Sequence, residues 1–157
     1  MKNIIILLFI IQLSNITYCQ CNCQTFTKNG LSALQCPLTP IAGDKSLQVG
    51  IGLAKSGDIN FISVAIRFKT IAENVTNNLS LTLTDGTMIE LPLYQSKLGY
   101  VGNNQVGGGN YILDESNLQL LKKVPIRSIS FYLEDNLKHL LMVQTNSRIL
   151  INQIKCL

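Results

Sequence analysis

Apolar and polar residues alternate with a period of two through much of the chain after residue 36, which predicts β-strands. The stretches 47–54 and 61–70 each place Leu, Val, Ile or Phe on one face and small or polar residues on the other. Residues 55–60 (KSGDIN) can turn the chain between them. Gly50 and Gly52 on the far face of the first strand either let another element pack closely or leave an open face.

A second pair of alternating stretches, 78–84 and 87–93, predicts a hairpin whose register can be worked out. A two-residue loop would set apolar residues of one strand opposite polar residues of the other. A three-residue loop, Thr84-Asp85-Gly86, pairs Leu81 with Ile89 and puts glycine at the left-handed third position. We therefore predict the three-residue loop.

The pattern of this hairpin returns in residues 129–143, where Glu134-Asp135-Asn136 occupies the turn and Asn takes the left-handed position. The chain has one histidine, His139, and this pattern places it in the second strand. It lies opposite Phe131 in a three-residue register and opposite Tyr132 in a two-residue register. A lone histidine in a strand is more often a packing residue than a catalyst.

Two short helices complete the prediction. Residues 117–123 can follow a cap at Asp114 or Ser116, and residues 147–155 can follow a cap at Thr145 or Asn146, with a final strand as the alternative. The predicted fold is mainly β: an antiparallel β-sandwich or partly open barrel with one or two short helices. The alternative is an α+β domain in which the C-terminal helix lies on a single antiparallel sheet.

The N-terminus has the features of a secretory signal peptide. An apolar run at residues 4–13 follows Lys2 and precedes a polar stretch, and it is far shorter than the ~20 residues that span a bilayer as a helix. We expect cleavage after residue 19, no stable membrane span, and a single domain over residues 20–157. The expected location is therefore secreted, periplasmic or at the cell surface.

Cleavage would leave four cysteines, Cys21, Cys23, Cys36 and Cys156, and an even number in an exported chain predicts disulfides. A bridge between Cys21 and Cys23 would be strained, so Cys36 and Cys156 should each bond one of them, with both connectivities open. A metal site of four thiolates fits this spacing poorly, because Cys36 and Cys156 stand alone. Acylation of Cys19 or Cys21 is a further, disfavoured alternative.

Charge and motifs exclude several classes of function. Without Lys2 the chain has 12 basic residues against 9 acidic ones, a net charge of +3, and the basic residues are scattered. Nucleic-acid binding needs clustered charge and aromatic platforms, so it is not expected. The sequence has no H-E-x-x-H or G-x-S-x-G motif and one histidine. We therefore assign no catalytic residue, metal ligand or cofactor.

Three stretches give the chain a resemblance to a known group: GDKSLQVGIGLAKSG at residues 43–57, LSLTLTDGTMIEL at residues 79–91, and VPIRSISFYLEDN at residues 124–136, followed by NQIKCL at the end. In these stretches the chain resembles small exported bacterial β-rich proteins of unknown function. The resemblance implies export and a compact β domain. It carries over no functional residue.

Residues 95–110 hold five of the 11 glycines and show no periodicity. They form either a flexible connection or a recognition surface, in which tyrosines supply rigid contact area and amides supply adaptable hydrogen bonds. The second interpretation predicts an exported binding module for a glycan or another protein's surface. The alternative is a small secreted hydrolase that uses His139, which must then line a pocket near a Ser, Asp or Glu. The predicted binding residues are Tyr94, Tyr100, Asn103, Asn104, Gln105, Asn110 and Tyr111.

Overall fold

The computed structural model describes residues 21–28 and 31–157, so the predicted signal peptide and Cys19 lie outside the described residues. Within these described residues, eleven strands form two antiparallel sheets, and two short helices accompany them. Every pair of neighbouring strands is antiparallel. The mainly β prediction is therefore confirmed, with two sheets in place of the single sheet of the α+β alternative.

The larger sheet has seven strands in the order β1-β2-β4-β5-β9-β8, and β3 shares an edge of β4 with β2. The smaller sheet has four strands in the order β11-β10-β6-β7. The bounds are β1 (Gln24–Lys28), β2 (Leu31–Gln35), β3 (Thr39–Gly43), β4 (Leu47–Ser56), β5 (Ile59–Phe68), β6 (Val75–Leu83), β7 (Met88–Leu91), β8 (Leu93–Val101), β9 (Asn104–Leu113), β10 (Ile126–Leu133) and β11 (Lys138–Met142), with helices α1 (Glu115–Leu121) and α2 (Ile149–Ile154).

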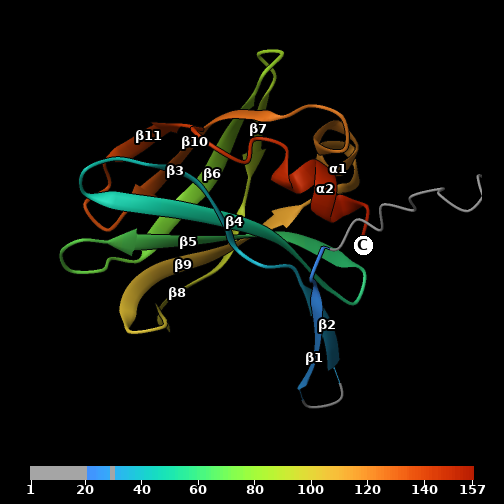
Figure 1. Ribbon diagram of the computed structural model, residues 1–157, viewed down its shortest axis with the longest axis horizontal. Coiled ribbons are helices and arrows are strands. Elements are labelled where there is room, and N and C mark those ends of the chain that lie inside the picture. Colours follow the sequence, from blue (N-terminus) through green and yellow to red (C-terminus); the bar gives the residue numbers. More distant parts are fainter. Residues whose placement is uncertain (1–20, 29–30) are drawn as a thin grey trace, which may run out of the picture.

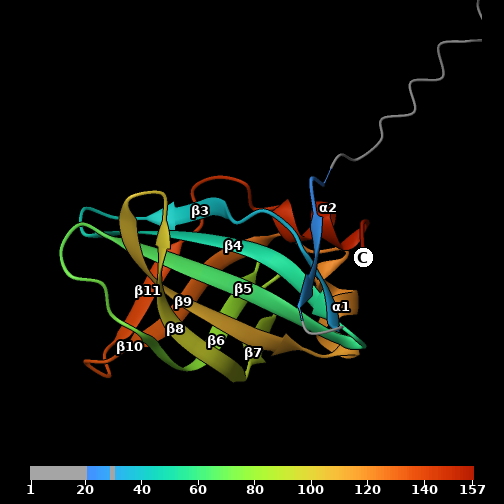
Figure 2. The same ribbon diagram turned by 90° about the horizontal axis from the view of Figure 1, so that it is seen from below.

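The core lies between the two sheets, whose strands cross one another (Figures 1 and 2). The inward positions of β4, β5, β6 and β10 are Leu, Ile, Val and Phe side chains that are almost fully buried. At one side the chain passes straight from β7 through Pro92 into β8 of the other sheet. At the other side the backbone N–H groups of Gln144 and Thr145 donate to the carbonyl of Ile41, 2.9 and 3.3 Å away. These two connections give the sandwich its partly closed, barrel-like form.

The first hairpin has the predicted three-residue register, and the second adopts the three-residue alternative of the two that the sequence left open. Leu81 pairs with Ile89, and Gly86 has a φ of 90°. Phe131 pairs with His139, and Asn136 has a φ of 58°. Left-handed residues at the third loop position let the strands keep their twist. The prediction of which side chains enter the core from these strands is confirmed as well, since Leu79, Leu81 and Leu83 have no exposed surface.

Residues 95–110 are not the flexible connection that was one of their two interpretations. They form most of the hairpin of β8 and β9, which turns at Gly102 with a φ of 61°. Gly107 and Gly109 face inward where the chain entering β6 crosses β9. A Cβ atom on Gly107 would lie 2.0 Å from the carbonyl oxygen of Glu73, so this close approach requires glycine. Gly107 and Gly109 therefore allow the two sheets to pack closely at this point.

Helix α1 begins after the predicted cap Asp114, whose carboxylate accepts a hydrogen bond from the backbone N–H of Asn117 at 2.8 Å. Helix α2 exists as predicted, but the prediction of a cap at Thr145 or Asn146 is wrong. Its N-cap is Arg148, which makes no capping hydrogen bond through its side chain. The helix is held by its buried face instead, because Leu150 and Ile154 join the core.

One residue of α2 completes the edge of β4. β2 and β3 share this edge and leave a gap between them, because they pair with residues 54–56 and 48–51. Gln153, which is buried, fills the gap: its Oε1 accepts from the backbone N–H of Leu53 and its Nε2 donates to the carbonyl of Pro37, both at 2.8 Å. A buried backbone N–H without a partner is costly, so this glutamine stabilises the edge.

Two disulfides close the N-terminal region onto the body: Cys21–Cys156 and Cys23–Cys36. The prediction that Cys36 and Cys156 each bond one member of the N-terminal pair is confirmed, and the structure selects one of the two open connectivities. Disulfides of this kind are typical of an oxidising, extracytoplasmic environment. In the part of the chain that the structure describes, neither helix has the length and apolar character needed to cross a bilayer.

Candidate functional site

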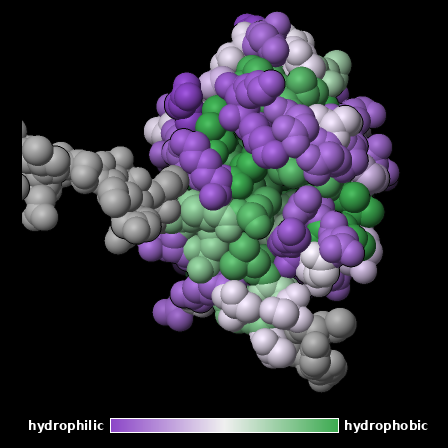
Figure 3. Space-filling model, turned by 90° about the vertical axis from the view of Figure 1, so that its right-hand side faces the viewer, coloured by the Kyte–Doolittle hydropathy of each residue, from purple (hydrophilic) through white to green (hydrophobic). Residues whose placement is uncertain are grey.

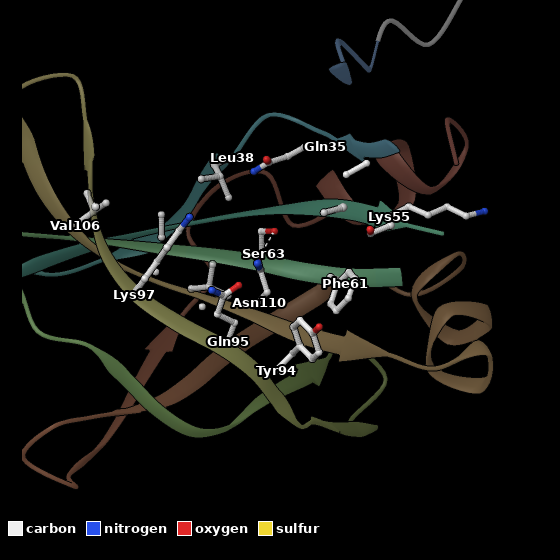
Figure 4. A pocket seen from close by; sticks show the side chains of 18 of the residues that line it. Gln35, Leu38, Lys55, Phe61, Ser63, Tyr94, Gln95, Lys97, Val106 and Asn110 are labelled. Atoms are coloured by element: carbon white, nitrogen blue, oxygen red, sulfur yellow. Dashed lines mark hydrogen bonds between the residues drawn. The ribbon is translucent and has the colours of Figure 1, made fainter. Parts of the chain in front are cut away.

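A hollow of the described surface lies on the outer face of the larger sheet, the face turned away from the core (Figure 4). We call it the outer groove. Its floor is formed by β4, β5 and β9, one wall by β2 and the segment after it, and the other wall by β8. Its volume is about 520 Å³, within the range of small-ligand sites.

The floor is low because its side chains are small. One cross-strand row runs through paired residues of β4, β5, β9 and β8: Gly50, Ala65, Gly108 and Lys97. The first three have no side chain larger than a methyl group, so Lys97 is the one long side chain of this row. The row beside it holds hydrogen-bonding groups: Ser63 pairs with Asn110, and Asn110 with Gln95. The alternation predicted for residues 61–70 already put Ser63 and Ala65 on one face, and this face is the floor of the groove.

The Ser63 hydroxyl donates to Oδ1 of Asn110 at 2.8 Å, and the serine itself is buried. This bond orients the amide of Asn110, because Oδ1 is taken as an acceptor and Nδ2 is left to donate. Among the described residues, neither Nδ2 of Asn110 nor the amide of Gln95 makes a hydrogen bond. We call Ser63, Asn110 and Gln95 the amide row.

An aromatic pair lies beside the amide row, one outward position away along β5. The rings of Phe61 and Tyr94 lie 5.2 Å apart between centroids and are tilted by 49°. Phe61 is buried in the floor, whereas Tyr94 is 61% exposed and leans on it from β8 (Figure 4). The pair offers a ring face and a phenolic hydroxyl to whatever enters the groove.

The opposite wall comes from β2 and the segment that follows it, through Leu34, Gln35 and Leu38. The β1–β2 hairpin projects from the body as an arm (Figure 1). Seen from the side where α1 and α2 lie, hydrophobic surface gathers near the centre of the view and is bordered by hydrophilic surface (Figure 3). Phe26 of the arm and Ile59 at the start of β5 are exposed large apolar residues.

A second hollow lies at the far end of β5. Asp44, Gln48, Arg67, Lys69 and Asn104 contribute its polar lining. Nη2 of Arg67 donates to Oδ1 of Asn104 at 2.9 Å. Ser46 hydrogen-bonds to Asp44 and lowers the pKa of that carboxyl, so an acid and a base are both present here. This hollow is therefore more balanced in charge than the outer groove.

The structure divides the predicted binding residues. Tyr94, Tyr100 and Asn110 line the outer groove, and Tyr100 is 75% exposed, as a recognition residue would have to be. Asn104 lines the second hollow. Two further residues of the β8–β9 hairpin, Asn103 and Gln105, are exposed and line neither hollow.

The assignment of Tyr111 to an exposed surface is wrong. Tyr111 has no exposed surface and lies in the core, because β9 is a strand and its alternate residues point inward. Burial raises the pKa of its phenol, and among the described residues the hydroxyl has no hydrogen-bond partner. A tyrosine in this position contributes packing.

His139 lies in the other sheet and lines neither hollow. Its ring stacks on Phe131 with centroids 5.5 Å apart, and its Nε2 is 3.8 Å from Oδ2 of Asp135 in the adjoining turn. In the described part of the chain, no group of three or more His, Cys, Asp or Glu residues is placed to hold a metal ion.

Comparison of the chain with protein-family models, with curated proteins and with solved structures gives no match. The site therefore has to be interpreted from its own chemistry. Phe61, Ser63 and Gln35 line the groove but were not predicted as binding residues. Phe61 and Ser63 belong to a strand that the sequence shows as an alternating pattern, whereas Gln35 belongs to β2, which the sequence analysis did not predict. An alternating pattern carries no information about which distant strand lies alongside.

Proposed function

We propose that this protein is an exported binding module that holds a polar ligand in the outer groove. The observation that carries the proposal is the lining: the amide of Asn110, oriented by Ser63, and the amide of Gln95 lie beside an exposed tyrosine in a hollow about 520 Å³ in volume. Ligand sites commonly combine apolar contact area with a few convergent polar groups. The two disulfides support an extracellular or envelope location.

A glycan suits this groove better than a broad protein surface. Amide side chains pair with hydroxyl groups, and a tyrosine ring gives the C–H face of a sugar an apolar surface to lie on. The groove is a concave hollow of about 520 Å³, whereas stable protein interfaces usually bury a broad area around an apolar centre. The hydrolase alternative receives less support, because His139 is outside both hollows.

The proposal is tested by screening the disulfide-bonded protein against an oligosaccharide panel and measuring affinity for the best ligand by calorimetry. Tyr94→Ala and Tyr100→Ala should each weaken binding at least tenfold. Both side chains are largely exposed, so the melting temperature should change little. Met88→Ala, at an exposed apolar position of the other sheet, is the matched control and should bind normally. Binding that survives both tyrosine substitutions would contradict the assignment of the groove.

A further inference from the structure

The outer groove has an uneven charge. Its lining includes two lysines, Lys55 and Lys97, and no aspartate or glutamate. The protein as a whole has 13 basic and 9 acidic residues, so acids are common enough elsewhere on the chain. A hollow lined by one sign of charge attracts ligands of the opposite sign.

The two lysines differ in where they point. Figure 4 shows the Lys55 side chain running away from the groove and the Lys97 side chain reaching from β8 across it, toward β4. Lys97 can lie this way because its row continues through Gly108 and Ala65 to Gly50, none of which has a side chain long enough to obstruct it. Of the two lysines, Lys97 is therefore the one whose side chain lies over the floor of the groove.

Lys97 has no acidic partner. Among the described residues the one contact within 4.0 Å between a basic and an acidic side chain joins His139 and Asp135, in the other sheet. A lysine side chain laid over a nearly bare floor, with no carboxylate opposite, gains little from the protein itself. An anionic group of a ligand would supply the missing partner and a charge-assisted hydrogen bond.

The three features follow one another along the groove. Phe61, Ser63 and Ala65 are successive outward positions of β5, and they mark the aromatic pair, the amide row and the row of Lys97. From Phe61 to Ala65 the strand covers about 13 Å at about 3.3 Å per residue. A ligand can thus stack on Tyr94, accept a hydrogen bond from Asn110 and place an anionic group at Lys97 at once.

We propose that the outer groove selects an acidic oligosaccharide, whose carboxylate or sulfate group is bound by the ammonium group of Lys97. This inference rests on the proposed function and adds the charge of the ligand. The sugar rings occupy the aromatic pair and the amide row, and the anionic substituent lies over Gly108 and Ala65. An acidic peptide would match the charge but would make less use of the hydrogen-bonding groups of the amide row.

The experiment screens the protein against acidic oligosaccharides with uronic acid, sialic acid or sulfate groups, each beside its uncharged parent, and against an acidic peptide. The expected result is a preference of at least tenfold for an acidic sugar over its parent. Lys97→Gln should remove that preference while leaving binding of the uncharged parent within about twofold. Comparison of carboxylated with sulfated sugars identifies the anionic group.

Lys55→Gln is the matched control, because it removes the same charge from the rim of the same groove. It should change affinity by less than about threefold. Equal binding of acidic and uncharged sugars, unaffected by Lys97→Gln, would overturn this inference and leave the proposed function intact. Binding of the acidic peptide in preference to every sugar would overturn the choice of ligand, and failure of every sugar and of the peptide to bind would overturn both proposals.

Discussion

Gly107 provides the sharpest test of how the two sheets are joined. It lies in β9, where the chain entering β6 crosses, and its backbone is extended. A Cβ atom built there would be 2.0 Å from the carbonyl oxygen of Glu73 and 3.3 Å from Cε2 of Phe68. The closest ordinary approach of carbon to a carbonyl oxygen is about 3.3 Å, so Gly107→Ala must displace the backbone at Glu73 by about 1 Å.

This displacement cannot be confined to a side chain. Glu73 lies two residues before Val75, which is buried and pairs with Leu133 at the start of β6. Overpacking that moves the backbone costs about 1–3 kcal/mol and occasionally more. We expect the upper end of this range for Gly107→Ala, which corresponds to a fall in melting temperature of about 8–12 °C for a domain of this size.

Gly108→Ala is the control, one residue further along the same strand. Its Cβ would point into the outer groove, 3.5 Å from the carbonyl oxygen of Val64 and 3.6 Å from that of Lys97, both ordinary contacts. Alanine also restricts the unfolded chain, so this variant should be neutral or more stable by about 0.5 kcal/mol. Gly109→Ala should fall between the two, because its Cβ would meet side chains instead of backbone: Cγ2 of Val75 at 2.6 Å and Cε2 of Tyr111 at 3.0 Å.

Thermal and urea unfolding of the three variants, followed by circular dichroism, give the comparison directly. The order of stability should be Gly108→Ala, then Gly109→Ala, then Gly107→Ala. Equal melting temperatures for Gly107→Ala and Gly108→Ala would refute the reasoning. That result would mean that the backbone at Glu73 can move without loss of stability and that Gly107 is not needed for the packing of the two sheets.

Three further predictions concern stability. Tyr111→Phe should be neutral or stabilising by about 1 kcal/mol, because it removes a buried hydroxyl that has no partner among the described residues. Burial raises the pKa of the Tyr111 phenol, so wild-type stability should fall as the pH rises above about 10, and Tyr111→Phe should reduce that fall in urea unfolding. The hydrogen bond from the backbone N–H of Asn117 lowers the pKa of the Asp114 carboxyl. Asp114→Ala should therefore lower the free energy of unfolding by about 1 kcal/mol at neutral pH, and by progressively less as the pH falls below about 4. An equal loss at all pH values would contradict the capping role of Asp114. Cys156→Ser opens a bridge that spans 135 residues and should destabilise the protein by about 2–5 kcal/mol in denaturant titrations, and a loss below 1 kcal/mol would speak against it.

The local features of this protein follow from its sequence. Period-two alternation identifies the strands around Leu81 and Phe131, and the left-handed residues Gly86 and Asn136 fix the loops that join them to their partners. Each strand and each loop depends on residues a few positions apart, so the local sequence is enough to predict it. The sequence also reduced the possible disulfide connectivities to two, because the geometry of a bridge between Cys21 and Cys23 is unfavourable.

The strand nature of residues 104–113 was decided by the tertiary structure. Glycine has no side chain to indicate a buried face, so Gly107, Gly108 and Gly109 gave no alternation to recognise. They are extended because β5 and β8 lie on either side and supply the hydrogen bonds. Tyr111 was misassigned for the same reason, since its face depends on the strand to which it belongs.

The outer groove depends on contacts between parts of the chain that are remote in sequence. Ser63, Gln95 and Asn110 form one row because β9 lies between β5 and β8, and Gln153 completes an edge 100 residues away at Leu53. Alternation shows which side chains share a face of one strand. Which strand lies alongside, and in which register, is set by the packing of the whole core, and that order brings an aromatic pair, an amide row and an unpaired lysine into one hollow.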